Sequence, residues 1–317
     1  MRTVLIAGRG EIAVRTARSC RELGLRTVAA YSTADREAEV LGLVDEVVLA
    51  GTWAPGGDCL NARDVIEAAR LTGADAIHPG DGSLSEDPDL ADVCAAEGIT
   101  LVGPPAAVRE EIADRARVRR LMAAAGLPVL PGSPDAVTTL AEARRAASEI
   151  GFPIVLKAVA GGCGTGMDTV HVPEEFSRAY RRARARAQAF PGDGRVYLER
   201  FVENARHIGI QVLCDSHGNA VHLGERDGSV AQRMGEAAVR GALAVGYVGA
   251  GTFEFLLDQA GRFHFVGVSC RTGLVREQLL IAAGEPLRGA PGIRGTDPVT
   301  GVLAAASSRP TFQADSS

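Results

Sequence analysis

A lysine followed closely by four glycines is the segment of this sequence with the clearest chemical character. In "KAVAGGCGTGM" (157–167), Lys157 ends the apolar run "FPIVL", which predicts a buried strand. Backbone N–H groups without side chains around them can surround a phosphate, and the lysine adds positive charge. A flexible hairpin turn between two strands explains the same composition. The segment is not the phosphate loop G-x-x-x-x-G-K-[ST], since here the lysine precedes the glycines.

A second glycine pattern lies near the start of the chain. "VLIAGRGEIA" places Gly8, Gly10 and Ala13 in the order G-x-G-x-x-A after a predicted strand, which is the setting of a dinucleotide-binding turn. That site also needs an acidic residue at the end of the second strand, whereas "AAYSTAD" has its acid, Asp35, displaced into the loop. NAD(P) binding is therefore a remote alternative to a structural strand-to-helix turn.

Composition excludes several classes of protein. The 317 residues are 46% hydrophobic and 23% charged, which suits a globular protein with a substantial core. The formal net charge of −5 gives no reason to expect nucleic acid, and no apolar run is long enough to span a membrane. The six cysteines form no C-x-x-C pair, so we expect neither a zinc site nor disulfides but reduced thiols in a cytoplasmic protein.

Strands and helices alternate over residues 1–110, and these elements must position the glycine segments. Strands are predicted at "TVLIAG", "RTVAAYS", "DEVVLA", "ADAIHPG" and "GITLVG". Amphipathic helices are predicted at "EIAVRTARSCREL" and "ARDVIEAARLTG", and they end at Gly24 and Gly73. Alternation of this kind predicts right-handed βαβ units and a parallel sheet, so the fold class is α/β.

The remainder of the chain divides at a Pro/Gly-rich segment. A helical stretch, "VREEIADRARVRRLMAAAG", leads into "LPVLPGSPDAV", and a helix ending at Gly151 precedes the strand with Lys157. In the basic helix "EEFSRAYRRARARAQAF" the arginines fall all round, which favours a solvated face over a nucleic-acid patch. Residues 288–317 are rich in Gly, Pro, Ser and Thr and are predicted to be disordered.

Eight segments in one order across residues 1–287 resemble biotin carboxylase, the ATP-grasp subunit or domain of biotin-dependent carboxylases such as acetyl-CoA carboxylase. They are "IAGRGEIAVR", "AIHPGDGSLSED", "LVGPP", "FPIVLKAVAGGCGTGM", "YLERFVENARHIGIQVL", "GNAVHLGERD", "GYVGAGTFEFLLD" and "EQLLIAAGEPL". The resemblance implies a Rossmann-like N-terminal domain without a dinucleotide (1–112), an ATP-grasp lid subdomain with its linker (113–203), and a truncated C-terminal ATP-grasp part (204–287). It also implies a mobile glycine-rich lid that closes over MgATP.

The resemblance assigns the phosphate end of a nucleotide site. Lys157 corresponds to the phosphate-binding lysine of the family. The lid glycines of the family correspond to Gly161, Gly162, Gly164 and Gly166. Thr165 stands where the family usually has an arginine. Arg115 replaces an expected lysine, so a planar guanidinium stands in place of a compact ammonium group.

The adenine end of the site is assigned to the segment "YLERFVENARH". Glu199 matches the acid that accepts a hydrogen bond from the adenine amino group. Arg200 and Val202 match residues whose backbone groups contact the nucleotide in the same segment, which is called the hinge. His207 stands where the family has a histidine near the nucleotide. ATP is therefore the nucleotide that the resemblance implies.

The resemblance implies two acidic residues that hold Mg²⁺, with Mn²⁺ as an alternative metal. Glu254 in "GTFEFLLD" matches the first acid. Gly267 stands at the second, and Ser269 stands at a neighbouring asparagine. Because Mg²⁺ can be held through one or two carboxylates plus substrate phosphates, we expect a site for one metal but not a two-metal clamp.

In the family, ATP phosphorylates bicarbonate, and the resulting carboxyphosphate delivers CO₂ to N1 of biotin on a carrier. Arg271 matches a catalytic arginine, but the following segment, with the glutamate that deprotonates bicarbonate, is missing, and Glu277 is predicted to begin the next helix. Met234 and Glu236 stand at histidine and lysine positions that the family uses for bicarbonate. The charge and the base that the reaction requires are therefore weakened.

Three interpretations follow. The first is a ligase of the biotin carboxylase family, as in fatty acid biosynthesis, with weak or lost activity. The second is a nucleotide-binding pseudoenzyme that acts as a partner or regulator of a carboxylase complex. The third, a remote one, is an NAD(P)-dependent enzyme. The expected partners are ATP, then bicarbonate and a biotin carrier protein if the chain is active, and either a second copy of the chain or other carboxylase subunits.

Overall fold

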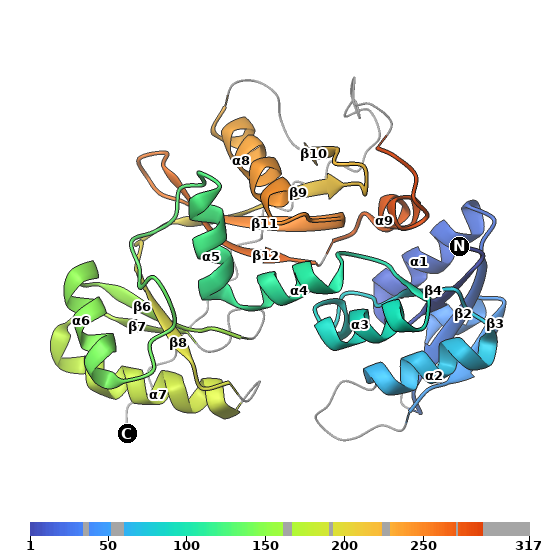
Figure 1. The fold of residues 1–317 in the computed structure, drawn as a ribbon, viewed down its shortest axis with the longest axis horizontal. Coiled ribbons are helices and arrows are strands. Elements are labelled where there is room, and N and C mark those ends of the chain that lie inside the picture. Colours follow the sequence, from blue (N-terminus) through green and yellow to red (C-terminus); the bar gives the residue numbers. More distant parts are fainter. Residues whose placement is uncertain are drawn as a thin grey trace.

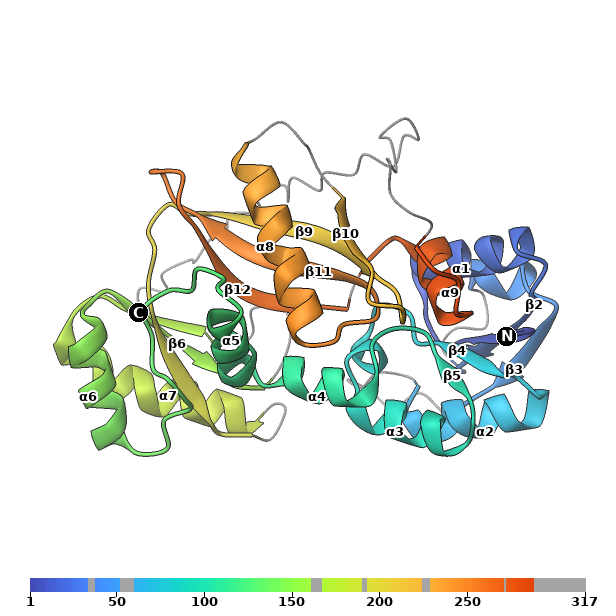
Figure 2. The ribbon, with the colours of Figure 1, turned by 45° about the horizontal axis from the view of Figure 1, so that its top comes forward.

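The computed structural model describes residues 1–33, 38–51, 60–160, 167–189, 193–223, 229–270 and 272–287. A unit built on a parallel sheet and a unit that carries Lys157 lie at opposite ends of the molecule, with a four-stranded sheet and the helices that cover it between them (Figures 1 and 2). The predicted tail, 288–317, lies outside the described residues. No helix in the described part of the chain is both long and apolar enough to cross a membrane.

The first unit is the predicted parallel α/β fold. Its sheet has the order β3-β2-β1-β4-β5, and all neighbouring strands are parallel. The strands are β1 (Thr3–Ile6), β2 (Arg26–Tyr31), β3 (Glu46–Leu49), β4 (Ala76–His78) and β5 (Thr100–Leu101). The helices are α1 (Gly10–Glu22), α2 (Ala62–Thr72) and α3 (Pro88–Ala96), with short 3₁₀ turns η1 (Glu39–Gly42) and η2 (Ser83–Ser85).

Local signals in the sequence set the ends of these helices. The side chain of Asn61 accepts a hydrogen bond from the Asp64 N–H (2.9 Å) and caps the start of α2. Gly73 ends the same helix with φ of 65°, a left-handed conformation that glycine adopts without strain. The predicted stop at this glycine is confirmed.

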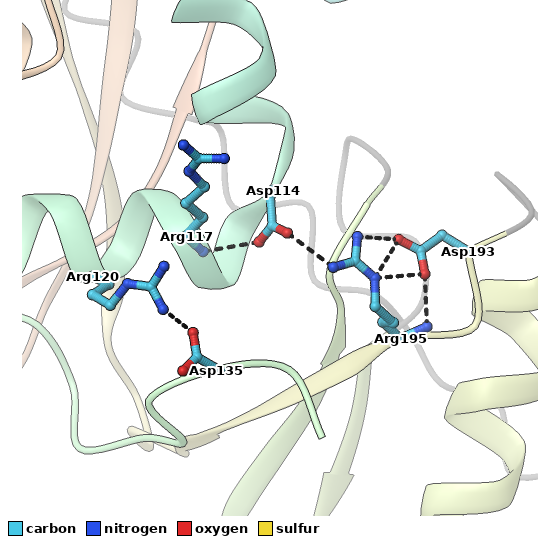
Figure 3. A network of polar contacts seen from close by, with 6 residues as sticks. All are labelled: Asp114, Arg117, Arg120, Asp135, Asp193 and Arg195. Atoms are coloured by element: carbon cyan, nitrogen blue, oxygen red, sulfur yellow. Dashed lines mark hydrogen bonds and ion pairs between the residues drawn. The ribbon is translucent and has the colours of Figure 1, made fainter. Parts of the chain in front are cut away.

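Two helices connect the first unit to the rest, where the sequence predicted one helical stretch. They are α4 (Ala106–Ala113) and α5 (Arg115–Ala124), and they break at Asp114. The carboxylate of Asp114 caps α5 by accepting from the Arg117 N–H (2.9 Å), and its other oxygen pairs with Arg195 (3.3 Å), which also binds Asp193 (Figure 3). A capping aspartate therefore starts a new helix in the middle of the predicted one.

The second unit contains Lys157 on a small antiparallel sheet of order β7-β6-β8. Its elements are α6 (Leu140–Ile150), β6 (Ile154–Ala158), β7 (Met167–Val170), the 3₁₀ turn η3 (Pro173–Glu175), α7 (Phe176–Ala189) and β8 (Val196–Arg200). Helices α6 and α7 bury their apolar faces against the sheet in one core cluster. In the basic helix α7, Arg182 and Arg186 form ion pairs with the buried Asp168. These two arginines therefore have a structural role.

The third unit is an antiparallel sheet of order β10-β9-β11-β12. Its elements are β9 (Arg206–Cys214), β10 (Ala220–Leu223), α8 (Val230–Ala244), β11 (Gly249–Leu257), β12 (Phe263–Ser269) and α9 (Val275–Ala282). Helices α5 and α8 pack on one face of this sheet around Phe253, Phe255 and Phe265. Helix α9 returns to the first unit, where Val275 and Leu279 join a core cluster with β1 and β4 (Figure 2).

Candidate active site

Lys157 and Glu199 form a buried ion pair on adjacent strands. The Nζ atom of Lys157, at the end of β6, lies 2.5 Å from Oε2 of Glu199 on β8. Glu199 is 1% exposed and Lys157 is 8% exposed. Side chains alternate between the faces of a strand, and both residues point to the face opposite α6 and α7. The lysine that the sequence assigned to phosphate therefore meets a carboxylate.

Arg119 is a third charged group of this site, and the sequence reasoning missed it. Its Nε atom lies 3.2 Å from Oε1 of Glu199, and its two terminal nitrogens donate to the carbonyl oxygens of Leu130 and Ser133. The Nε–H does not point along the contact with Glu199, so the attraction is ionic and not a directed hydrogen bond. The available signal was the spacing from Arg115, since residues four apart lie on one face of a helix.

Arg115 stands where the glycine segment begins. Its backbone N–H donates to the carbonyl oxygen of Val159 (3.1 Å), which ties the start of α5 to the end of β6. Burial, reinforced by the negative charge of Glu199, raises the pKa of Tyr197 well above its ordinary value, while the positive charges of Arg115 and Arg119 act in the opposite direction. Arg115 and Arg119 therefore both lie near the Lys157–Glu199 pair.

Arg200 and Val202 lie at the end of β8, where the sequence placed the hinge. The Arg200 N–H donates to the carbonyl oxygen of Pro131 (2.8 Å), and its guanidinium donates to the carbonyl oxygen of Ile150. The Arg200 side chain therefore lies on the α6 side of the sheet, away from Lys157. Val202 is half-buried in the segment that leads to β9.

His207 and Glu254 form a second pair, on the face of the four-stranded sheet opposite α5 and α8. His207 Nε2 lies 3.5 Å from Glu254 Oε2, and both side chains are partly exposed. On β11, Phe253 and Phe255 point into the core while Glu254 points the other way, as alternation requires. The structure thus brings the four sequence-predicted residues together as two pairs on two sheets, Lys157 with Glu199 and His207 with Glu254.

Glycines occupy both positions across from Glu254. Gly209 on β9 and Gly267 on β12 are its partners in the strand register. A Cβ atom built on Gly267 would lie 3.5 Å from Glu254 Oε2, and no other described residue beyond its chain neighbours lies within 4 Å of it. An acid at residue 267 would therefore reach the Glu254 carboxylate. In the part of the chain that the structure describes, no group of three His, Cys, Asp or Glu residues is placed to hold a metal.

A hydrogen-bond chain supports this sheet face, and no pattern in the sequence predicted it. Gln211 Nε2 donates to Thr252 Oγ1 (2.7 Å), and Thr272 Oγ1 donates to Gln211 Oε1 (2.6 Å). The Leu274 N–H then donates to Thr272 Oγ1 (3.2 Å). The chain of bonds links β9 and β11 to the segment that starts α9.

The structure shows the surroundings of Met234 and Glu236, which the sequence matched to a histidine and a lysine position of the family. Both belong to α8, whose start is capped by Ser229. Met234 is 3% exposed in the core beside Phe253, so it cannot face bicarbonate. Glu236 lies on the exposed side of the same helix and accepts a hydrogen bond from Gln232 (3.0 Å). Glu277 lies in the first turn of α9, as predicted.

The G-x-G-x-x-A pattern forms a tight turn against a neighbouring strand. A Cβ atom on Gly8 would lie 2.8 Å from the Gly80 Cα, and Gly10 begins α1 with φ of 57°. Close backbone approach explains Gly8, and the left-handed conformation explains Gly10. The pattern therefore has a structural cause. Asp35 lies outside the described residues.

Several predicted residues lie in segments that the structure does not describe. They are the lid residues Gly161, Gly162, Gly164, Thr165 and Gly166, together with Arg271 and Cys163. Four other cysteines are buried and form no disulfide; they are Cys20, Cys94, Cys214 and Cys270. Burial raises the pKa of each of these thiols, to about 12 for Cys20, so none of the four is activated as a nucleophile.

Comparison with known proteins decides the family. Residues 1–108 match the family model "Biotin carboxylase, N-terminal domain", and residues 114–241 and 229–288 match "Carbamoyl-phosphate synthase L chain, ATP binding domain". A biotin carboxylase from Nostoc sp. is 42% identical over 319 residues, which cover 90% of this chain and 71% of that protein. The chain belongs to the biotin carboxylase family. Biotin carboxylase 2 from Bacillus subtilis is 41% identical over 317 residues, which cover 90% of this chain and 71% of that protein.

Solved structures of the biotin carboxylase family share the fold. The biotin carboxylase from Campylobacter jejuni in complex with β,γ-ATP superposes with a TM-score of 0.86 and is 34% identical, over 91% of this chain and 72% of that chain. The biotin carboxylase domain dimer of the 2-oxoglutarate carboxylase from Hydrogenobacter thermophilus, with MgADP, ADP and bicarbonate, has a TM-score of 0.84 and is 36% identical, over 91% of this chain and 71% of that chain. The ATP-grasp fold predicted from the sequence is confirmed.

Proposed function

We propose that this chain binds MgATP and couples its cleavage to the carboxylation of biotin through carboxyphosphate, at a rate reduced by changes in its catalytic half. The observation that carries the proposal is the position of Lys157. Its ammonium group lies at the end of β6, beside Glu199 and directly before the glycine segment. A lysine placed there can bind the phosphates of a nucleotide held under residues 161–166.

The other predicted nucleotide contacts are proposed to bind the phosphates or the adenine of the same nucleotide. Arg115, whose backbone N–H is bonded to the Val159 carbonyl at the end of β6, is proposed to supply a second cation for the phosphates. Glu199 and the backbone of Arg200 and Val202 are proposed to bind adenine, and His207 to lie near the nucleotide. The Campylobacter jejuni relative forms a complex with β,γ-ATP, which supports the choice of nucleotide.

Glu254 is proposed to hold one Mg²⁺ ion together with the nucleotide phosphates. Its carboxylate is partly exposed and has His207 as its neighbour at 3.5 Å. Mg²⁺ is commonly held through one or two carboxylates and substrate phosphates, so this donor set fits one ion, with Mn²⁺ as an alternative. When bound, the metal would neutralise charge on the phosphates. Gly267 removes the second carboxylate of the family, so a two-metal arrangement does not fit.

The catalytic half carries two differences from the family that should lower the rate. Arg271 is proposed to face the bicarbonate or carboxyphosphate anion. The family's glutamate base has no counterpart, because only residues 272–274 separate Arg271 from α9. Loss of a general base typically costs about 10²–10⁴-fold in rate. Gly267, at the second metal position, favours a second candidate function, a nucleotide-binding regulator of a carboxylase complex.

The partners follow from the proposed reaction. Bicarbonate and a biotin carrier protein are the co-substrates that an active chain requires. The Hydrogenobacter thermophilus relative is a dimer with bound bicarbonate, which supports a homodimer or an assembly with other carboxylase subunits for this chain. The cytoplasm is the proposed location.

Two measurements test the proposal. Titration calorimetry of the chain with MgATP should show binding, and Lys157→Ala should weaken it by about tenfold or more. ATP cleavage is then followed with and without bicarbonate and free biotin, and transfer of radiolabelled bicarbonate to biotin is counted, with Arg271→Ala as the control. Slow ATP cleavage that depends on bicarbonate supports an enzyme with a lowered rate. Tight ATP binding without turnover supports the nucleotide-binding regulator. Well-folded chain that binds neither ATP nor ADP would refute both.

A further inference from the structure

We propose that Arg119 is a positioning residue that keeps the positive charge of Lys157 available to phosphate. The inference rests on the proposed binding of ATP. Arg119, Glu199 and Lys157 form a row in which the carboxylate lies between two cations, at 3.2 Å from the first and 2.5 Å from the second. The Glu199 side chain is 1% exposed, and those of Arg119 and Lys157 are each 11% exposed.

Charge balance is the physical reason for this role. Lys157 and Glu199 alone form a neutral pair, and a neutral pair attracts the phosphates of a nucleotide only weakly. Arg119 brings the row to a net charge of about +1, because it neutralises Glu199 through Oε1, whereas Lys157 contacts Oε2. Burial strengthens the effect, since buried charges are screened less by water and salt than exposed ones.

Arg119 is held in place by contacts that a ligand does not need to break. Its terminal nitrogens donate to the carbonyl oxygens of Leu130 and Ser133, in the segment that runs beside β8. That segment is itself joined to β8, because the Ser133 N–H donates to the Leu198 carbonyl (2.8 Å) and Gly132 pairs with Glu199. The guanidinium is therefore fixed against the same strand that carries Glu199, whether or not Lys157 changes its partner.

The test compares Arg119→Met with Arg120→Met. Arg120 is the next residue on α5, and its exposed guanidinium pairs with Asp135 and not with Glu199; Figure 3 shows this pair. Titration calorimetry with MgATP should show a loss of affinity of about tenfold or more for Arg119→Met and little change for Arg120→Met. Thermal unfolding of both variants checks that each chain is folded at the temperature of the titration.

Adenosine separates a charge effect from damage to the hinge. It has no phosphate, so the availability of the Lys157 charge does not affect its binding. Competition against a fluorescent nucleotide should therefore show that Arg119→Met binds adenosine as the unchanged chain does, while its ATP affinity falls. Equal losses for adenosine and ATP would overturn the proposal, because they would show that Arg119 only braces the hinge.

Two further variants test the charge directly. Arg119→Lys loses the guanidinium that donates to two carbonyl oxygens but keeps a positive charge beside Glu199. Because the proposal rests on that charge, the variant should retain most of the ATP affinity. The double variant Arg119→Met/Glu199→Gln restores a net charge of about +1, and Gln keeps an acceptor oxygen, so it should recover most of the affinity that Arg119→Met loses. No recovery in the double variant would overturn the proposal.

The two proposals fail in distinguishable ways. If the unchanged chain binds ATP and Lys157→Ala abolishes the binding while Arg119→Met does not weaken it, the role of Arg119 is refuted and the proposed function stands. If the unchanged chain does not bind ATP at all, the proposed function is refuted and the role of Arg119 with it.

Discussion

Gly267 lies directly across the β11–β12 pair from Glu254, and a Cβ atom on it would lie 3.5 Å from a carboxylate oxygen of Glu254. Residue 267 therefore points to the same side of the sheet as the proposed metal ligand. The position has room for a side chain, since among the described residues, apart from its chain neighbours, no other atom lies within 4 Å of that Cβ. The resemblance implies the family's second metal-binding acid at this position, and a single side chain at residue 267 would bring a second carboxylate to Glu254.

Gly267→Glu should strengthen metal-dependent nucleotide binding. A second carboxylate beside Glu254 adds a ligand and a negative charge for Mg²⁺, so we expect the Mg²⁺ concentration at half-saturation to fall by about tenfold. Titration of Mg²⁺ at fixed ATP measures this shift. Gly267→Gln is the matched control, because it has the same size without the charge. The prediction is wrong if the two variants show the same Mg²⁺ dependence.

Acid should destabilise the chain through His78. Its Nδ1 atom accepts from the Gly80 N–H (3.1 Å), and its Nε2 atom lies 3.3 Å from Gln278 Oε1 on α9. Burial lowers the pKa of His78 to about 4. Between that value and the unfolded pKa of about 6.5, the unfolded chain binds a proton that the folded chain does not. The free energy of unfolding should therefore fall by about 2 kcal/mol from pH 7.5 to pH 5.

Denaturant unfolding at several pH values checks the role of His78, with His78→Gln as the comparison. The variant should be less stable at pH 7.5 but should lose less stability on acidification. Some dependence of the free energy of unfolding on pH should remain, because burial also lowers the pKa of His264. If the free energy of unfolding of His78→Gln depends on pH as that of the unchanged chain does, the loss of stability in acid arises from other groups.

Gly8→Ala should destabilise the fold without a specific effect on nucleotide binding. The added methyl group would lie 2.8 Å from the Gly80 Cα, so two backbone segments must move apart. Overpacking of this kind costs about 1–3 kcal/mol. Gly82→Ala is the control, because nothing lies within 4 Å of a Cβ atom there. Chemical denaturation compares the two, and NADH binding that Gly8→Ala abolishes would instead restore the dinucleotide interpretation.

Arg109→Met should be strongly destabilising. The Arg109 side chain is buried, and its guanidinium donates to the carbonyl oxygens of Pro104, Ser85 and Val102. Removing the donor leaves buried carbonyls unpaired, and we expect a loss of about 3 kcal/mol in the free energy of unfolding.

Arg117→Met supplies the comparison for Arg109→Met. Arg117 forms a surface ion pair with Glu111 on the neighbouring helix, and such pairs contribute about 0–1 kcal/mol. Equilibrium denaturation should therefore separate the two variants clearly. Equal stabilities would show that the loops around Arg109 find other donors.

The sequence by itself determined the elements whose causes are local. The alternation of strands and helices over residues 1–110 predicted the parallel sheet, and Gly73 and Gly151 marked the ends of α2 and α6. These features depend on hydrophobic period, caps and glycine conformation, which neighbouring residues set. The ordered series of motifs also identified the family, and within that series Lys157 matched the family's phosphate-binding lysine.

Contacts between distant residues were decided only by the tertiary structure. Arg119 and Glu199 meet because α5 and the segment after it pack beside β8, and Gly267 faces Glu254 because of one strand register. A shift of one residue would turn every side chain of that strand to the other face, and no local pattern shows which register is chosen.

The same reason explains why a match by residue order did not show the surroundings of Met234. The sequence matched Met234 to a histidine position of the family, and the apolar stripe of α8 buries it against the sheet. Helix α9 likewise returns to pack on the first unit through Val275 and Leu279. Sequence order and residue type determined which groups are present, whereas burial of apolar surface between separate units decided which of them meet.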